Sequence, residues 1–583
     1  MEKYTSNSIR KTIQKISFLM IISFSASTVI ADINTNEERR ALTHYNDAEG
    51  KYIRNIEISP RDISSKSIQD EEAYMPEWFG SFINSLHIET EDWVVDNYLL
   101  FEEGDRLDPE KLEESERLLR ASGLFLDARI RITENLPDSV DVIVITKDKW
   151  TLSLDLSYQA KNKSGYFGLS DDNMLGYGHS IKARGSYERN RNIGWGGELN
   201  YKAQNIAGSY VDAEGLLVSN GRFLTRSIGA SRSFYRTNTK YAGGISFSWL
   251  NGNVEFISGE EELVTVSYKK REQDIWAGRS YPLFFGPDIF RQKSRLITSL
   301  RISRTRFPSR PEVSEDKNRL YENQTLYLAN FGFINRRYFK DHYVNNFGKT
   351  EDIAVGGILS LTFGSDVREF NDRWYAGLTG VYSKSIPLVG YFSTKIELGG
   401  FKNVGRWEQN IFNLNFAYHS PLDMYPEIKL RHFLQFDYLL GFDRFEGEQI
   451  YLNTLTGLRG IDGYELNGTK RIVLNLESRL ITGLSPLGFV IGGIIFSDFG
   501  VISSGERNIS NSKVYQSYGI GLRTSNESFA GATFEVSLVY NPFDFQNSSG
   551  AFNILFSGSF VLGSRNFGFS KPSIINFGEG RVD

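Results

Sequence analysis

The sequence predicts a large antiparallel β-barrel that spans a membrane, preceded by one small α+β domain. Many segments after residue 150 alternate apolar and polar residues, which is the period of strands with one apolar face. The chain is 14% aromatic and contains 54 glycines, yet its mean hydropathy is only -0.33. A barrel explains this combination, because it turns every second side chain toward lipid and keeps polar side chains in its interior.

The composition narrows the chemistry of the chain. There is no cysteine among the 583 residues, so disulfides and thiolate metal sites are excluded, and the formal charge of -5 does not indicate a nucleic-acid binder. The six histidines are scattered without metal spacing, and no Gly-x-Ser-x-Gly elbow is present. Residues 463–470 resemble a phosphate loop, but the order Gly-Thr-Lys and the missing helix pattern argue against one. We therefore expect no enzyme activity, no cofactor and no metal.

Residues 1–31 have the pattern of a secretory signal. Basic residues precede an apolar run from Ile16 to Ile30, and Val29-Ile-Ala31 reads as a cleavage site. The alternative is a membrane anchor helix, which serine and threonine within this short run disfavour. No other stretch approaches ~18 uninterrupted apolar residues, so any later membrane crossing must use strands. Residues 32–49 are polar, and we expect them to be flexible.

Residues 50–149 predict the small α+β domain. A strand over 52–58 is followed by an irregular stretch, 59–88, and then by a helix that Thr90 caps. A second helix has Asp108 as its cap and Pro109 at its first position, and it ends at Gly123. Two strands, at 126–132 and 140–145, close the domain.

Residues 150–562 predict the barrel wall, whose first strand is 151–158 and whose closing strand is 552–562. A soluble sheet protein would point its polar faces outward instead, and alternation alone does not distinguish the two arrangements. The secretory signal and the aromatic residues near the end of the chain favour the barrel. Pattern alone allows about 16 to 20 strands. The apolar residues of the first and closing strands are Leu152, Leu154, Leu156, Phe552, Ile554, Phe556 and Phe560.

One loop is distinguished by its arginine. In the segment 471–480 the apolar residues share one parity and Glu477 lies on the other, so Glu477 faces the polar interior. The next strand carries Asp498, and Gly500 on the same face leaves room for a close approach. Arg459 in the preceding loop can bind two carboxylates at once and cannot lose its charge. The alternative is a surface hairpin with an exposed Arg-Gly turn.

The loop resembles a sequence of the BamA/TamA-type outer-membrane assembly superfamily. That family has Val-Arg-Gly-Phe/Tyr in the loop, Phe-x-Asp-x-Gly on a following strand and Asn-Leu-Leu-Gly-x-Gly early in the barrel, which residues 173–178 resemble. In the family the loop folds into the barrel, and its arginine meets acids on the following strands. Ile461 stands where the family has an aromatic residue, a departure that bears on the stacking of the loop tip and not on the arginine. The matching positions, here called the loop-lock residues, are Leu458, Arg459, Gly460, Ile461, Glu477, Phe496, Asp498 and Gly500.

The α+β domain resembles a POTRA domain in its order of elements and in residues 101–105 and 112–120, and it is present once. The resemblance implies a barrel of 16 strands, with some hairpins before residue 290 outside the lipid, and a POTRA domain in the periplasm. It also implies an insertase or translocase of the outer-membrane bilayer, which moves unfolded outer-membrane or secreted polypeptides, or lipid, through a weak seam between the first and last strands, with periplasmic accessory proteins. The rival interpretation is a channel or surface-antigen barrel that moves no client.

The edge of the α+β domain is a candidate docking site, because an edge strand can take up an extended client as an added strand. We predict that either 140–145 or the strand 52–58 on the opposite edge does so. The alternative is a folded spacer, since exposed edges are commonly blocked. The residues of this predicted docking edge are Tyr52, Ile56, Val140, Val142 and Val144.

The chain continues for 21 residues beyond Leu562, from Gly563 to Asp583. Lys571-Pro572 prevents regular ladder pairing, so we expect this tail to lie on the periplasmic side. There it could plug the pore, rest on the α+β domain or be disordered. Its apolar residues favour packing against something, and a frayed terminus is the alternative.

Overall fold

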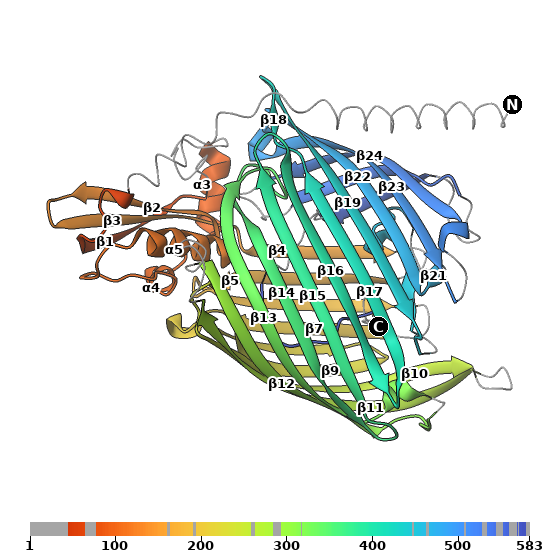
Figure 1. Ribbon diagram of the computed structural model, residues 1–583. Coiled ribbons are helices and arrows are strands. Elements are labelled where there is room, and N and C mark those ends of the chain that lie inside the picture. Colours follow the sequence, from red (N-terminus) through yellow and green to blue (C-terminus); the bar gives the residue numbers. More distant parts are fainter. Residues whose placement is uncertain are drawn as a thin grey trace, which may run out of the picture.

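The computed structural model separates the chain into an α+β unit and one large curved sheet (Figure 1). The expected secretory signal, 1–31, and most of the expected flexible segment, 32–49, lie outside the described residues. The described residues are 45–63, 77–159, 164–189, 194–257, 263–283, 293–315, 318–445, 448–461, 466–505, 509–526, 533–543, 552–558, 568–569 and 571–578.

The α+β unit contains a three-stranded sheet in the order β1–β3–β2, in which β3 is parallel to β1 and antiparallel to β2. Helix α5 starts as predicted, because the Asp108 side chain accepts a hydrogen bond from the Glu110 amide at 2.9 Å and Pro109 occupies the first turn. The elements are β1 (Tyr52–Arg61), α3 (Glu77–Leu86), α4 (Asp92–Asp96), α5 (Pro109–Ala121), β2 (Phe125–Asn135) and β3 (Ser139–Asp148).

Two predictions for this unit were wrong. Residues 59–88 are not irregular throughout, since they contain α3, in which Trp78 and Phe82 are exposed. Residues 45–49, which we expected to be flexible, pack into the core of the unit. Tyr45 and Ala48 are buried there, and the Tyr45 hydroxyl donates to the carbonyl oxygen of Ile130.

The large sheet is antiparallel and curves into a barrel of 21 strands in the part of the chain that the structure describes, one of which, β18 (Asp423–Met424), has only two residues. The other strands are β4 (Leu152–Gln159), β5 (Ser164–Met174), β6 (His179–Glu188), β7 (Gly194–Ala203), β8 (Val211–Ser219), β9 (Phe223–Arg232), β10 (Tyr241–Ile257), β11 (Leu263–Pro282), β12 (Ser294–Ser309), β13 (Gln324–Asp341), β14 (Glu351–Arg368), β15 (Arg373–Ile386), β16 (Gly390–Asn403), β17 (Arg406–His419), β19 (Ile428–Phe442), β22 (Lys470–Thr482), β23 (Val490–Ser503), β24 (Val514–Ser525), β25 (Thr533–Tyr540) and β26 (Phe552–Gly558).

The expected count of 16 strands was wrong. The hairpins before residue 290, some of which we expected outside the lipid, continue the same sheet, because each of β5 to β11 pairs antiparallel with the next, with one register shift between Asp171 and Met174. Their alternation is that of the later strands, with Leu199 and Ile228 exposed on the outer face. The alternation pattern alone allowed about 16 to 20 strands, and the upper end of that range is the better estimate of the strand number.

The two faces of the sheet have opposite character. Large apolar side chains are exposed on the outside, among them Leu154, Leu300 and Phe556, whereas polar and charged side chains such as Arg431 and Glu535 are buried inside. A soluble protein packs its apolar faces together, so this arrangement is the inverse of a soluble sheet and fits a wall surrounded by lipid. In the part of the chain that the structure describes, no helix combines the length and apolarity needed to cross a bilayer.

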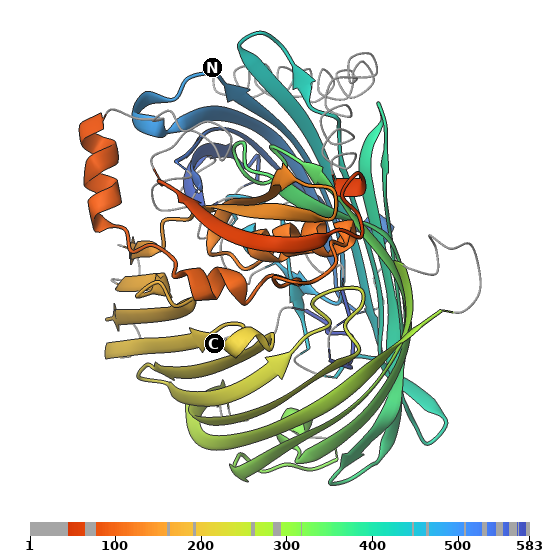
Figure 2. The same ribbon diagram turned by 90° about the vertical axis from the view of Figure 1, so that its left-hand side faces the viewer.

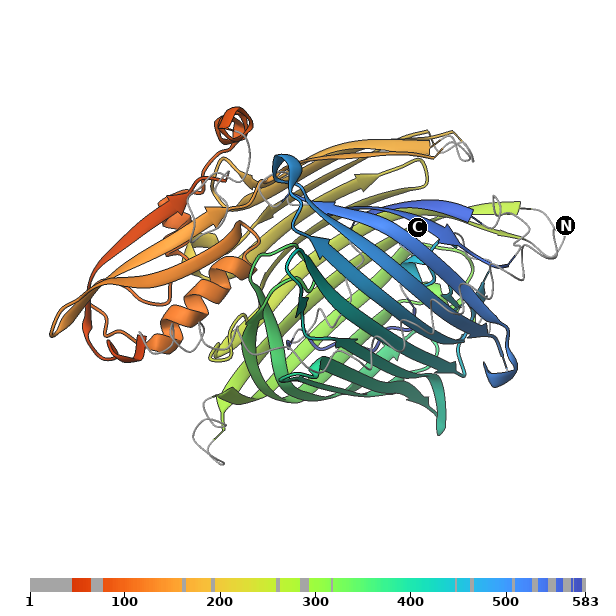
Figure 3. The same ribbon diagram turned by 90° about the horizontal axis from the view of Figure 1, so that it is seen from above.

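The α+β unit lies across one end of the barrel (Figures 2 and 3). Turns of the barrel contact it at 173–178, 204–210, 233–240 and 342–350, so we call this the domain end. Because successive strands alternate in direction, the long connection 443–469 between β19 and β22 lies at the opposite end. Of the three alternatives kept for the tail, its described residues fit the one inside the pore, where Phe569 packs against Gly332 and the Ile575 amide donates to the Tyr375 hydroxyl.

Candidate functional site inside the barrel

The connection 443–469 turns into the barrel and carries four of the loop-lock residues, Leu458 to Ile461, whereas the other four lie on the strands β22 and β23. Asn453 caps the short helix Thr454–Thr456, and Gly457 and Gly460 follow with φ of 107° and 78°, a backbone that favours glycine. Leu458 is completely buried, in an apolar cluster with Ile461. Ile461 therefore holds the loop in place by packing against these aliphatic side chains.

Arg459 is bound by two carboxylates, as the strand parity predicted. Its Nη1 lies 2.6 Å from Glu477 Oε2, while its Nη2 and Nε lie 2.7 and 2.8 Å from the two oxygens of Asp498. All three side chains are at most 2% exposed. The pairing with Asp498 is bidentate, a geometry that lysine could not reproduce.

The same arginine stacks on an aromatic ring of the barrel wall. The guanidinium carbon of Arg459 lies 3.5 Å from the centroid of the Phe496 ring. Gly519 makes room for that ring, since a Cβ there would lie 2.2 Å from Phe496. Gly500 does admit a close approach, but the approaching group is the side chain of Leu452 in the same connection, 2.7 Å from where a Cβ would stand, rather than the arginine.

The backbone of the loop is held by the last strands of the barrel. The carbonyl oxygen of Arg459 accepts hydrogen bonds from Ser517 on β24 and, at 3.2 Å, from Asn541 just after β25. Asn553 on β26 donates to the carbonyl oxygen of Gly460 at 3.1 Å. These polar residues were not predicted as part of the site, although the inward parity of Asn553 was the available signal. The loop-lock residues thus contact the closing strand itself.

A second turn meets this cluster from the domain end. Arg479 pairs with the other oxygen of Glu477 at 2.6 Å and donates to the carbonyl oxygen of Val344 at 2.5 Å, and Arg523 donates to that of Asn345 at 2.9 Å. Within the turn 342–350, the carboxylate of Glu351 accepts from the amides of Val344 and Asn345 at 3.0 Å each. Connections from both ends of the barrel therefore meet at Glu477.

The turn 342–350 and its flanking strands also bind the α+β unit. Arg120 of α5 forms a bidentate pair with Asp352, with both hydrogen bonds at 2.8 Å. Glu116 of the same helix lies 2.9 Å from Lys340 Nζ. Thr350 donates its hydroxyl to Asp127 at 3.1 Å. A chain of polar contacts thus extends from Arg459 through Glu477 to the α+β unit.

The turn 173–178, singled out by its sequence, belongs to the same contact. Asn173 donates to the Thr90 hydroxyl at 2.8 Å, and Thr90 in turn donates to Asp148. Thr90 therefore does not cap α4 as predicted, since its side chain is used here and Glu91 is the N-cap. A Cβ at Gly176 would lie 2.3 Å from the carbonyl oxygen of Glu89, so glycine is required for this close approach.

The prediction of a docking edge at 140–145 was wrong. Strand β3 lies between β1 and β2, and Val140, Val142 and Val144 are buried in the core of the unit. Strand β1 is an edge, but its first half is covered. The Ile53 amide donates to Asp105 at 2.9 Å, and the Ile56 amide donates to the Glu103 side chain at 3.0 Å.

The other edge, β2, is also covered in the part of the chain that the structure describes. Its Ile130 amide donates to Glu116 at 2.8 Å, and its Ala128 carbonyl oxygen accepts from Arg120 at 2.8 Å. Tyr52 is half-exposed, whereas its backbone pairs with Arg106. Both edges of the unit are thus covered in part, and whether the strand Tyr52 to Ile58 docks a client or the unit is a folded spacer stays a prediction.

The first and closing strands are neighbours in the sheet order, and their outward residues are exposed as predicted. Strand β4 pairs with β5 in a continuous register, and β26 pairs with β25 in the same way. The sheet order places β26 and β4 side by side as hydrogen-bonded neighbours, so the barrel closes between its last and first strands. The predicted end of the closing strand, including Phe560, lies outside the described residues.

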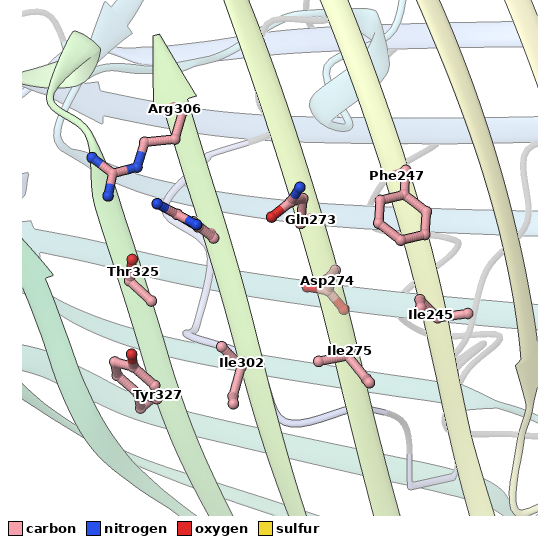
Figure 4. A pocket seen from close by; sticks show the side chains of 10 residues that line it. Ile245, Phe247, Gln273, Asp274, Ile275, Ile302, Arg306, Thr325 and Tyr327 are labelled. Carbon is pink, nitrogen blue, oxygen red and sulfur yellow. The ribbon is translucent and has the colours of Figure 1, made fainter.

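The outer face carries one cleft, of about 540 Å³, on β10 to β13 (Figure 4). Its lining includes the apolar residues Ile245, Ile275 and Ile302 and, further along β12, Arg304 and Arg306. Apolar side chains with arginines beyond them are typical of the boundary between the hydrocarbon core and the lipid head groups.

Comparison with known proteins gives distant likenesses only. No protein-family model matches the chain, and no curated protein matches it. The chain is similar to BamA from Haemophilus ducreyi lacking POTRA domains 1-3, with 12% identity over 87% of this chain and 84% of that chain and a TM-score of 0.37. It is similar to CdiB from Acinetobacter baumannii (10% identity, 88% and 74% covered, TM-score 0.40) and to CdiB from Escherichia coli (11%, 88% and 76%, 0.43). At such identities and TM-scores these likenesses assign no function, which must follow from the residues of the chain.

Proposed function

We propose that the chain is an outer-membrane barrel of the BamA/TamA type that inserts or translocates client polypeptides, or lipid, without enzymatic chemistry. In this proposal residues 1–31 are a secretory signal and residues 50–149 are a single POTRA domain in the periplasm. The exposed apolar outer face and the buried charges inside support a location in a membrane. The cleft with Arg304 and Arg306 fits the level of anionic lipid head groups.

The observation that carries the proposal is the link between the loop-lock residues and the closing strand. Arg459 ties the loop to β22 and β23, while Asn553 ties the same loop to β26. Strand β26 is the neighbour of β4 in the sheet order, so the loop is attached to the wall where the last and first strands meet. A seam of this kind can open and expose an edge to which an incoming strand pairs.

The rival function is a channel or surface barrel that moves no client. Three segments occupy the interior: the loop residues 453–461, the turn 342–350 and the tail residues 571–578. An open channel would require them to move. The interior therefore favours a barrel that opens at its side over one that conducts through its centre.

Depletion of the protein followed by outer-membrane proteomics and lipid analysis tests the proposal. We expect the selective loss of one class of outer-membrane polypeptide or lipid, restored by the intact gene. The intact gene is the control. An Arg459→Ala variant produced at equal abundance should restore the lost polypeptides or lipids only in part. An unchanged envelope after depletion would favour the rival.

A further inference from the structure

The described tail residues, 568–569 and 571–578, lie along the inner wall of the barrel on a surface that we call the groove. Phe569 is 9% exposed and packs with buried apolar residues of β10 to β15, including Trp276 and Ile334. A Cβ at Gly332 of β13 would lie 1.7 Å from the tip of the Phe569 ring. The ring therefore occupies a slot that exists only because residue 332 is glycine.

Two further side chains of the tail are placed in the same way. Ile575 lies 3.1 Å from the position of a Cβ at Gly399 on β16, and Phe577 lies 2.3 Å from that at Gly441 on β19. Phe577 also carries the guanidinium of Arg444 over its ring at 4.0 Å. Three inward glycines on three strands thus receive three apolar side chains of one peptide.

Polar contacts fix the main chain of the tail between these slots. Arg301 donates to the carbonyl oxygen of Pro572 at 2.9 Å, and the Ile575 amide donates to the Tyr375 hydroxyl at 2.8 Å. Lys571 lies 3.6 Å from Asp274. Two of these contacts are made to backbone groups of the tail and one to the charge of Lys571. Backbone groups are free to make such contacts in an extended peptide, whereas a helix uses them internally.

The path of the tail has the length that an extended peptide needs. From Phe569 to Phe577 an extended chain spans about 26 Å at ~3.3 Å per residue. Its two slots, on β13 and β19, are five strand spacings apart in the sheet order, or about 24 Å at ~4.8 Å each. The tail thus crosses the strands instead of pairing with one. Figure 4 shows this last segment passing behind the strands that carry the outer cleft.

We propose that this groove is a binding site for an extended polypeptide segment with aromatic residues at the spacing of Phe569 and Phe577, and that the tail is its resident ligand. The client segment displaces the tail when it enters the barrel. That a client occupies the groove rests on the proposed function. The groove itself is inferred from the glycine slots and from the contacts of Arg301 and Tyr375 with the tail.

Binding of the tail peptide in trans tests the groove. The protein is truncated after Leu562, and a fluorescent peptide of residues 566–580 is titrated into it in detergent micelles. We expect saturable binding, at least about tenfold weaker to the intact chain because the attached tail has a high effective concentration. Gly332→Val with Gly441→Val in the truncated protein should weaken binding at least about tenfold by filling both slots.

Gly380→Val is the matched control, because a Cβ at Gly380 meets nothing within 4 Å, and it should leave binding unchanged. A peptide with Phe569→Ala and Phe577→Ala should bind no better to the truncated protein than to the slot-filled variant. Absence of saturable binding, or equal binding to the slot-filled protein, would overturn the proposal. Peptide binding together with an envelope unchanged on depletion would leave the groove standing and reject the proposed function.

Discussion

Replacing Arg459 by alanine should release the loop from the barrel interior, and the structure indicates by how much. The substitution leaves Glu477 paired with Arg479 at 2.6 Å, so only Asp498 loses its cation. Asp498 keeps hydrogen bonds from Asn475 at 2.7 Å and from the amide of residue 459 at 3.3 Å. Breaking a buried ion pair costs about 3–5 kcal/mol, and these remaining donors place the expected cost at the lower end, about 3 kcal/mol. That corresponds to roughly a 100-fold increase in the equilibrium constant for loop opening.

The absence of cysteine from the chain makes this measurable. Ile461→Cys places a thiol at a position that is 7% exposed, and its rate of maleimide labelling follows the population of the opened loop. We expect Arg459→Ala to raise this rate roughly 100-fold and Arg459→Lys, which keeps the charge but loses the fork, to raise it less. Leu455→Cys, 75% exposed in the same loop, should label equally fast in all variants. A rise below about threefold at Ile461→Cys would refute a cost of this size.

Two other predictions concern the docking of the α+β unit and the loop backbone. Burial alone would raise the pKa of Glu116, but Lys340, Arg120 and Arg129 outweigh burial and hold this pKa below its ordinary value of 4.5. Of these three cations only Lys340 belongs to the barrel, so only its contribution depends on docking. That contribution favours the docked state while Glu116 is ionised and is lost as the pH falls through the lowered pKa. Energy transfer between dyes on α5 and on the turn 342–350 should therefore decline at acidic pH, and Glu116→Gln should flatten the decline. Gly460→Ala should raise labelling at Ile461→Cys, because residue 460 has φ of 78° and a Cβ would lie 2.7 Å from Val539; unchanged labelling would show that the loop tolerates this strain.

The sequence predicted best what short-range rules determine. Strand parity placed Glu477 and Asp498 inside, and the charge of Arg459 then required partners there. Helix α5 followed from Asp108 and Pro109, because capping depends only on neighbours in the chain. These features need no knowledge of which strands become neighbours.

The failures concern arrangement between distant segments. Residues 140–145 read as a strand, but their central place between β1 and β2 depends on pairing across the whole unit. The count of 16 came from a resemblance, whereas the extra hairpins carry the same alternation as the rest of the wall. The groove for the tail needs Gly332, Gly399 and Gly441 on one inner face, and only the register of the assembled sheet aligns them.

The central claim is that clients pass at the seam between β4 and β26. A photo-crosslinking amino acid at Ile554, which faces outward on β26 and is 65% exposed, tests it in living cells against the same group at Leu300, 67% exposed on β12 far from the seam in the sheet order. We predict that Ile554 captures newly made polypeptide while Leu300 captures none. Equal capture at the two positions, or none at Ile554 while the protein is active, would contradict the account.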